Sequence, residues 1–429
     1  MNGIQYTHAC YKTNWLFTVY SLYIVLLIAA CSNFSQTLAA QLLFIAFSVI
    51  LLIRNNSYWI KDRFGIGFLI LCLAVICIQY TITGVFMLGS VKFILILTVV
   101  YYMIREYKAY FMESLMQVVY GLVLITVPFY IVQLLDPGLL KSLLAPFNFS
   151  FAEQARSGGI YVFFFNLNPF TLFRNSGFMW EPGAFGGILL FLIIYEYVRN
   201  DKQINRKIVV LSLYALTTIS TTTYLALLLF ACLILLKKNR KQPVVLFVSL
   251  SVFVLAAIET YNLPFMGSKI NSYLNNNTDY TTIDENINGG YTTGSSIGRF
   301  AGLLIVMKRL EKSPVVGNGW DNDYSDLGLS DKWSNPNGLA SVLGKFGILG
   351  VAFLVYGLYS FVSYSKKGMV LEEAVLVLIL LFPVFSNPFE SNIIMWVLAL
   401  AGIYLKAGKQ QSIRQLMPAY SYQNNEHHN

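Results

Sequence analysis

The chain has 429 residues, of which 56% are hydrophobic and 12% are charged. A soluble domain carries about 25% charged residues, so this composition excludes a soluble enzyme, a disordered chain and a nucleic-acid-binding protein. It is typical of a protein that crosses a membrane several times. In such a protein the net charge of +9 indicates basic loops on one side of the membrane and does not imply a nucleic-acid partner.

Apolar stretches of about 20 residues predict membrane-spanning helices, because a hydrocarbon layer of about 30 Å requires that length. We expect twelve spans, at 15–32, 36–53, 64–82, 85–104, 114–135, 183–198, 207–220, 222–236, 242–260, 338–363, 371–386 and 389–405. The predicted fold class is therefore an all-α, multi-span integral membrane protein.

The spans and the long polar segments between them divide the chain into six parts. In order, they are N-terminal helices (1–135), a first large outer loop (136–182), central helices (183–260), a second large outer loop (261–337), C-terminal helices (338–406) and a tail (407–429). Both large loops contain aromatic residues, glycines and charges. We expect function to lie where these loops cover the membrane-embedded helices.

The segments 207–220 and 222–236 are short and are separated by the polar residues 220–223. They are either two helices meeting at a polar turn or one long tilted span. The flanking segments 199–207 and 237–241 are both strongly basic, which favours the cytoplasmic side for both. Two crossings between them are then required, so we predict the pair of helices and place both termini in the cytoplasm.

The first large loop ends with an arginine and an acid just before a predicted span. Arg174 can bind a phosphate or a carboxylate through its two-pronged guanidinium group. Glu181 precedes Pro182, which suits the first turn of a helix, and an acid there complements the helix dipole. Two interpretations stay open: Glu181 caps the helix and pairs with Arg174, or both residues belong to a binding site.

The second large loop contains a predicted amphipathic helix that begins at Arg299. One face of this helix is expected to contain Phe300, Leu303, Leu304, Met307 and Leu310. The helix either lies at the membrane interface or packs against other helices. Because a cation at a helix N-terminus opposes the helix dipole, Arg299 indicates an anionic ligand.

Two lysines, Lys92 and Lys345, lie within predicted spans. A cation in the membrane costs at least about 2.5 kcal/mol on insertion scales, so each residue invites a functional interpretation. A structural interpretation is equally open, since a lysine near the end of a span can extend its ammonium group to the interface.

Several motifs follow one another in a fixed order across the second loop and the next span. They are Gly298-Arg299 with an apolar helix, Pro314, Gly317-Asn318-Gly319, Asn337 and Gly347-Ile348-Leu349-Gly350. Their order and spacing resemble the O-antigen ligase and polymerase superfamily. The segment from Arg174 to Gly187 resembles that family's outer-loop arginine followed by a span, so the resemblance covers roughly 170–360.

Two departures favour the polymerase branch, the Wzy-type enzymes. The ligase branch has a histidine immediately before the asparagine, where this chain has Pro336. It also often has an acid two residues before the Gly-Ile-Leu-Gly stretch, where this chain has Lys345.

The resemblance implies a GT-C-like glycosyltransferase in the bacterial cytoplasmic (inner) membrane. It would join undecaprenyl-diphosphate-linked oligosaccharide repeat units at the outer face, in contact with membrane lipids. The acceptor hydroxyl attacks the anomeric carbon of the donor chain and the lipid diphosphate leaves. No cofactor and no metal are implied, and a protein that regulates chain length is the expected partner.

Residue roles follow from the same resemblance. Arg174 and Arg299 would bind the diphosphate, and Glu181 would act as general base on the acceptor hydroxyl. The residues expected to bind substrate are Asn335, Asn337, Trp320, Tyr291 and Lys345.

Three alternatives remain at this level. A ligase would use the same donor and transfer the glycan to lipid A–core. A flippase for the lipid-linked glycan would have charged residues along a path through many spans, whereas here the polar residues gather in two loops on one side. A membrane scaffold protein is the third.

Overall fold

The structure, a computed structural model, describes 15–28, 37–54, 63–148, 159–168, 172–239, 299–320, 337–364, 369–389 and 393–406, with single positions at 242 and 251. Helices make up 82% of it, and five of them are long and apolar enough to cross a membrane. The protein is therefore an all-α membrane protein. The expected span 242–260 and most of the second large loop lie outside the described residues.

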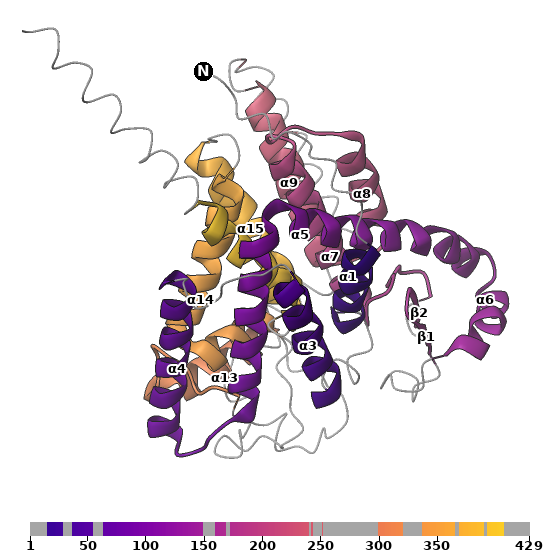
Figure 1. Ribbon diagram of the computed structural model, residues 1–429. Helices are drawn as coiled ribbons and strands as arrows, with labels where there is room; N and C mark the ends of the chain where they lie inside the picture. The colour runs from indigo at the N-terminus through magenta and orange to yellow at the C-terminus, as the bar shows by residue number, and fades with distance from the viewer. Residues whose placement is uncertain are drawn as a thin grey trace, which may run out of the picture.

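The N-terminal helices pack around one long, bent helix. This helix, α5 (Leu88–Leu135), contacts α1 (Trp15–Ile28), α3 (Leu38–Arg54) and α4 (Arg63–Thr83). Figure 1 shows α5 changing direction sharply, and Lys108 within it has a left-handed backbone (φ 49°). The expected spans 85–104 and 114–135 are thus the two arms of α5, joined by a bend.

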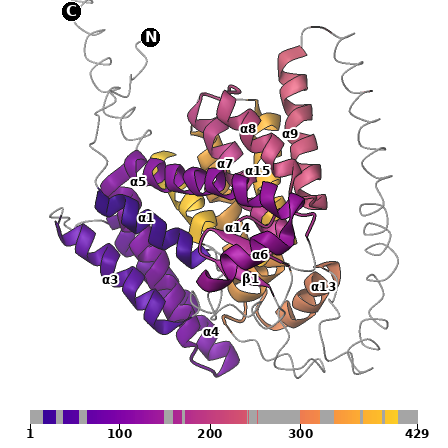
Figure 2. The same ribbon diagram turned by 90° about the vertical axis from the view of Figure 1, so that its right-hand side faces the viewer.

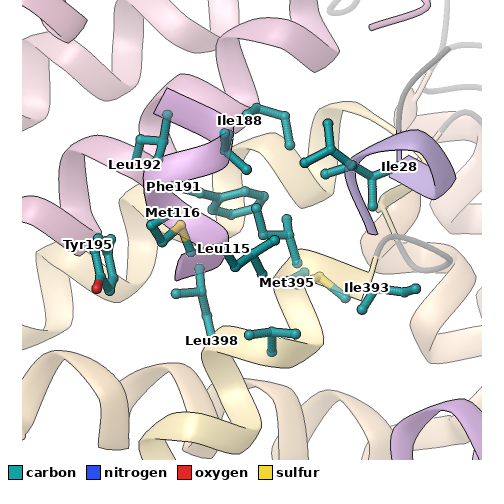
Figure 3. Close-up of a cluster of buried hydrophobic side chains, with 14 of the residues drawn as sticks. Ile28, Leu115, Met116, Ile188, Phe191, Leu192, Tyr195, Ile393, Met395 and Leu398 are labelled. Carbon is teal, nitrogen blue, oxygen red and sulfur yellow. The ribbon is translucent and has the colours of Figure 1, made fainter. Parts of the chain in front are cut away.

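Helix α7 (Pro182–Arg199) lies at the centre of the protein. It is apolar on all sides, as is typical of a helix with no face in water, and 89% of it is buried. It packs against α8 (Arg206–Leu216), α9 (Thr221–Asn239) and α15 (Val370–Ser386). Figure 3 shows side chains from α1, α5 and the helix Ile393–Lys406 meeting those of α7.

The predicted pair of helices that meet at a polar turn is confirmed. Residues 217–220 separate α8 from α9. With 11 residues, α8 is about 16 Å long, which is half a membrane crossing. The expectation of two short helices is wrong for α9, which has 19 residues because it continues to Asn239.

The first large loop contains regular structure that the sequence did not predict. It has a short helix α6 (Pro137–Leu144), a 3-10 turn η2 (Ala145–Phe147) and an antiparallel hairpin of β1 (Ile160–Val162) with β2 (Phe165–Leu167). Figures 1 and 2 both show the hairpin beside α6. From the hairpin, Asn166 donates to the Met179 carbonyl (2.9 Å) and Tyr161 donates to the Phe178 carbonyl (3.0 Å). The hairpin therefore fixes the segment that leads into α7.

At one end of the central helices, the two basic segments meet buried acids. Lys202 Nζ lies 3.3 Å from Glu373 Oε1, and Lys237 Nζ lies 2.8 Å from Glu372 Oε1. Arg199, at the last turn of α7, pairs with α5. The segments 199–207 and 237–241 therefore lie at the same end of the bundle, as their charge predicted. The first turn of α7 is about 27 Å away, since α7 has 18 residues.

Candidate functional site

Three predicted site residues from distant parts of the sequence come together at the start of α7. Arg299 Nη2 lies 3.9 Å from Glu181 Oε1. Arg174 lies within electrostatic range of both residues. Burial, the largest cause, lowers the pKa of the Arg174 guanidinium; Glu181 opposes this effect and the charge of Arg299 adds to it. We call Arg174, Glu181 and Arg299 the arginine site.

The backbone of the Arg174 turn is fixed by the second arm of α5. Gln133 Nε2 donates to the carbonyls of Leu172 (2.7 Å) and Arg174 (3.2 Å). Tyr130 donates from its hydroxyl to the Phe173 carbonyl (3.0 Å). Three consecutive carbonyls are thus bound by one helix, which sets the direction in which Arg174 leaves the turn.

The polar turn between α8 and α9 fixes Arg174 from another side. Arg174 Nε donates to the Thr218 carbonyl (3.3 Å), and the backbone N–H of Asn175 donates to the Thr217 carbonyl (3.1 Å). Ile219, next in the turn, has φ 45°, a conformation that is unusual for a β-branched residue. Such strain costs on the order of 1–3 kcal/mol and gathers at functional sites. The turn is therefore part of the site and not a plain connection.

Glu181 is the N-cap residue of α7, but its side chain makes no capping hydrogen bond. The carboxylate faces Arg299 and is 39% exposed. The interpretation of Glu181 as a helix-capping side chain is therefore wrong, because its carboxylate turns toward the second arginine. Close packing keeps this end of α7 in place: a Cβ on Gly186 would overlap the Thr223 hydroxyl of α9.

Arg299 begins α13 (Arg299–Arg309), and Asn337 fixes this start to the next helix. Asn337 Nδ2 donates to the Arg299 carbonyl (3.0 Å), and its Oδ1 accepts from the Ala340 amide (3.0 Å). The second bond caps α14 (Gly338–Ser363). Asn337 was predicted to bind substrate, but both ends of its amide are used within the protein. It joins α13 to α14 and so positions Arg299.

The face of α13 that packs on α14 overlaps the expected apolar face only in part. Leu304 and Met307, expected on that apolar face, are 36% and 54% exposed. Ile305 and Val306 are buried instead, and Leu310, at the start of the 3-10 turn η5 (Leu310–Lys312), is buried as predicted. The cause is contact with α14, against which α13 packs through Val306 and Leu310. The helix-packing interpretation therefore describes α13 better than an interfacial one.

The two glycine motifs form one unit, in which the loop after η5 lies in a break of α14. Four backbone hydrogen bonds join them: Asn318 N to Gly344 O (2.7 Å), Gly319 N to Lys345 O (3.1 Å), Ile348 N to Pro314 O (2.9 Å) and Leu349 N to Val315 O (3.0 Å). Gly317 and Gly347 both have positive φ (69° and 64°). A Cβ on Gly317 would overlap the backbone of α14, and a Cβ on Gly347 would overlap the backbone of the loop. Only glycine allows the two segments to approach so closely.

Lys345 and Trp320 contact each other. Lys345 Nζ lies 4.6 Å from the centre of the Trp320 ring, which packs against Phe93 and Phe346. Lys345 lies about 12 Å along α14 from Asn337, a little over two turns. Their substrate-binding roles stay predictions, and their observed role is packing and a cation–π interaction.

Two other predicted substrate-binding residues, Tyr291 and Asn335, lie outside the described residues. Conversely, the sequence did not indicate Gln133, Thr218 or Asn387, which all lie at the site. Gln133 is 2% exposed and Asn387 is fully buried. A buried amide at the end of an apolar segment needs a partner, and this requirement is the signal by which Gln133 and Asn387 could have been found.

A comparison with protein-family models, curated proteins and solved structures finds no match. The chemistry of the site is therefore inferred from its own geometry.

The arginine site is rich in positive charge. In the recorded interactions of the described residues, two guanidinium groups lie near one carboxylate, and the two arginines repel each other. Helices α7, α9, α13 and α14 all begin near these residues, and helix N-termini add partial positive charge. Such an arrangement is suited to an anion, and guanidinium groups bind phosphate oxygens in two-pronged fashion.

Proposed function

We propose that the protein is a polysaccharide polymerase of the O-antigen type. It joins undecaprenyl-diphosphate-linked oligosaccharide repeat units by glycosyl transfer at the outer face of the bacterial cytoplasmic membrane. The observation that supports this most is the meeting of Arg174 and Arg299 at one carboxylate, Glu181, at the buried start of α7. A lipid diphosphate is an anion that two guanidinium groups can bind together.

In the proposed reaction, the hydroxyl of the acceptor unit attacks the anomeric carbon of the donor chain. The bond between that carbon and the diphosphate oxygen breaks, and its electron pair stays with the diphosphate. Glu181, 39% exposed, accepts the hydroxyl proton. Arg174 and Arg299 stabilise the charge on the departing diphosphate. Both arginines are fixed from the backbone side, so little reorganisation is needed during transfer.

The orientation in the membrane is part of the proposal. The basic residues Arg199, Lys202, Lys207 and Lys237 lie at the opposite end of α7 from Glu181. Cytoplasmic loops are enriched in lysine and arginine, so that end would be cytoplasmic and the arginine site would face outward. Both termini are then expected in the cytoplasm.

The experiment is a glycan ladder on a gel from cells with the gene, without it, and with the gene restored as wild type or Arg174→Ala. A polymerase predicts that deletion leaves single repeat units on the final carrier. Arg174→Ala is expected to give the same result with a normal amount of protein in the membrane. Lys207→Met, at the far end of the bundle, is the control and is expected to restore the ladder.

Other outcomes would contradict the proposal in distinct ways. Polymer that forms but stays on the carrier lipid would identify a ligase. Repeat units trapped on the cytoplasmic side would identify a flippase. Long polymer with Arg174→Ala would refute the role of Arg174 in binding the diphosphate.

A further inference from the structure

Asn387 lies where three helix ends meet. It follows the last residue of α15 and is fully buried. Its backbone carbonyl lies against the first residue of α14, where a Cβ on Gly338 would overlap it. Its side-chain amide lies beside the first turn of α7, 3.5–3.6 Å from where a Cβ on Gly183 would be. The position is therefore fixed from two sides by glycines that allow close approach.

The amide of Asn387 has one orientation that satisfies both of its ends. With the nitrogen toward α7, it donates to Glu181 Oε1, and its oxygen accepts from the Ser386 hydroxyl (2.8 Å). In the reverse orientation the amide oxygen would face the carboxylate oxygen, and two acceptors would meet without a proton between them. The Glu181 carboxylate, which can only accept, thus selects the orientation in which Asn387 donates to it, and the Ser386 hydroxyl satisfies the amide oxygen.

Both recorded contacts of the Glu181 carboxylate go to the same oxygen. Arg299 Nη2 lies 3.9 Å from Oε1, and Asn387 donates to Oε1 as well. Within the described residues, no contact is recorded for Oε2. The ionisable groups that face Glu181 from the surrounding elements are Arg299 of α13 and Arg174 of the preceding turn.

We propose that Asn387 is a positioning residue that binds Oε1 of Glu181, fixes the direction of the carboxylate and leaves Oε2 to take the proton of the acceptor hydroxyl. This inference depends on the proposed function for its last step only. A hydrogen bond from a buried, neutral donor favours the charged form of a carboxylate without competing for a diphosphate. Arg299 alone, at 3.9 Å, is too distant for a direct hydrogen bond.

The test is Asn387→Asp, which keeps the size of the side chain, removes the donor and places a second acid beside Glu181. Two quantities are measured as a function of pH. The first is labelling of Glu181 by a water-soluble carbodiimide, which reacts with protonated carboxyl groups, followed by mass spectrometry. The second is polymer formation from purified protein in liposomes with undecaprenyl-diphosphate-linked repeat units.

In Asn387→Asp, labelling of Glu181 is expected to persist to a pH about one unit higher than in the wild type. The acid side of the activity profile should move in the same direction. At neutral pH, polymer formation should fall at least about tenfold. The added acid shifts both profiles by its charge as well, so a variant that adds no charge is needed to isolate the hydrogen bond.

Asn205→Asp is the matched control. Asn205 also donates to a glutamate, Glu196 Oε2 (3.4 Å), but at the other end of α7. The chemical change is the same but lies at the far end of α7, so labelling of Glu181 and activity should be unchanged. Ser386→Ala is the second test variant and adds no charge: it removes the hydroxyl that donates to the Asn387 amide oxygen and should shift Glu181 labelling in the same direction by a smaller amount.

An unchanged labelling profile in folded Asn387→Asp would overturn the proposal. If that variant does not fold, an unchanged profile in Ser386→Ala would do so. A shifted labelling profile in a protein whose wild type forms no polymer would refute the proposed function and leave the contact between Asn387 and Glu181 standing.

Discussion

The contact between the two glycine motifs predicts that Gly347→Ala strongly lowers the stability of the protein. Gly347 has φ 64° and ψ −163°, a region that is essentially restricted to glycine. Strain there costs about 1–3 kcal/mol. An alanine Cβ would also overlap the Val315 carbonyl, so the loop would have to move away from α14. Loss of the two hydrogen bonds next to Gly347, at about 0.5–1.5 kcal/mol each, raises the expected cost to about 2–6 kcal/mol.

The assay is thermal unfolding of the purified protein in detergent, with Gly121→Ala as the matched control. Gly121 lies in α5, and a Cβ there would meet nothing within 4 Å. Alanine is favoured over glycine in a helix by about 1 kcal/mol, so the control should unfold at the same or a higher temperature. Gly347→Ala should unfold at a clearly lower temperature.

The same substitution should reduce activity, because the loop connects the break in α14 to the end of α13. Asn318, in the loop, lies between these two helices: its amide nitrogen donates to Gly344 O and its side chain reaches the Arg309 carbonyl (3.5 Å). Movement of the loop therefore loosens the helix that begins at Arg299. If Gly347→Ala unfolds at the wild-type temperature, the contact between the motifs is not the one described and the argument fails.

Three further substitutions separate the roles of charge at the two ends of the bundle. Arg299→Lys keeps the charge but loses the two-pronged guanidinium, so we expect at least about a tenfold loss of polymer formation with unchanged protein levels in the membrane. Lys202→Met removes the cationic partner of the buried Glu373, and loss of one member of a buried pair costs about 3–5 kcal/mol in unfolding experiments. Lys207→Met, whose pair with Glu196 is 41% exposed on the lysine side, should cost at most about 1 kcal/mol.

The apolar pattern predicted most of the helices because span length follows from membrane thickness. The starts of α7 and α14 lie within a residue of the predicted positions, and the two basic segments lie at one end as predicted. The meeting of Arg174, Glu181 and Arg299 was also predicted, although only through the order of motifs. Such features depend on local composition, which a single sequence shows directly.

Features that depend on contacts between distant segments were missed. The buried face of α13 is set by α14, so spacing along α13 alone did not indicate Ile305 and Val306. The contacts of Trp320 with Phe93 of α5 and with Lys345, which lies over its ring, were also not predicted. The acids that pair with the basic segments, Glu372 and Glu373, gave no periodic signal because they lie at the first turn of a helix.

The motif residues help to fix where Arg299 lies. Asn337 donates to the Arg299 carbonyl, and Gly347 allows the loop after α13 to approach α14 closely. A free arginine side chain has many rotamers, and ordering it costs up to about 2 kcal/mol, so fixing its backbone lowers the cost of binding an anion. Gln133 and the 217–220 turn do the same for Arg174. The two arginines repel each other. The hydrogen bonds to their backbone and to Arg174 Nε are therefore what keeps both in place before the proposed anion binds.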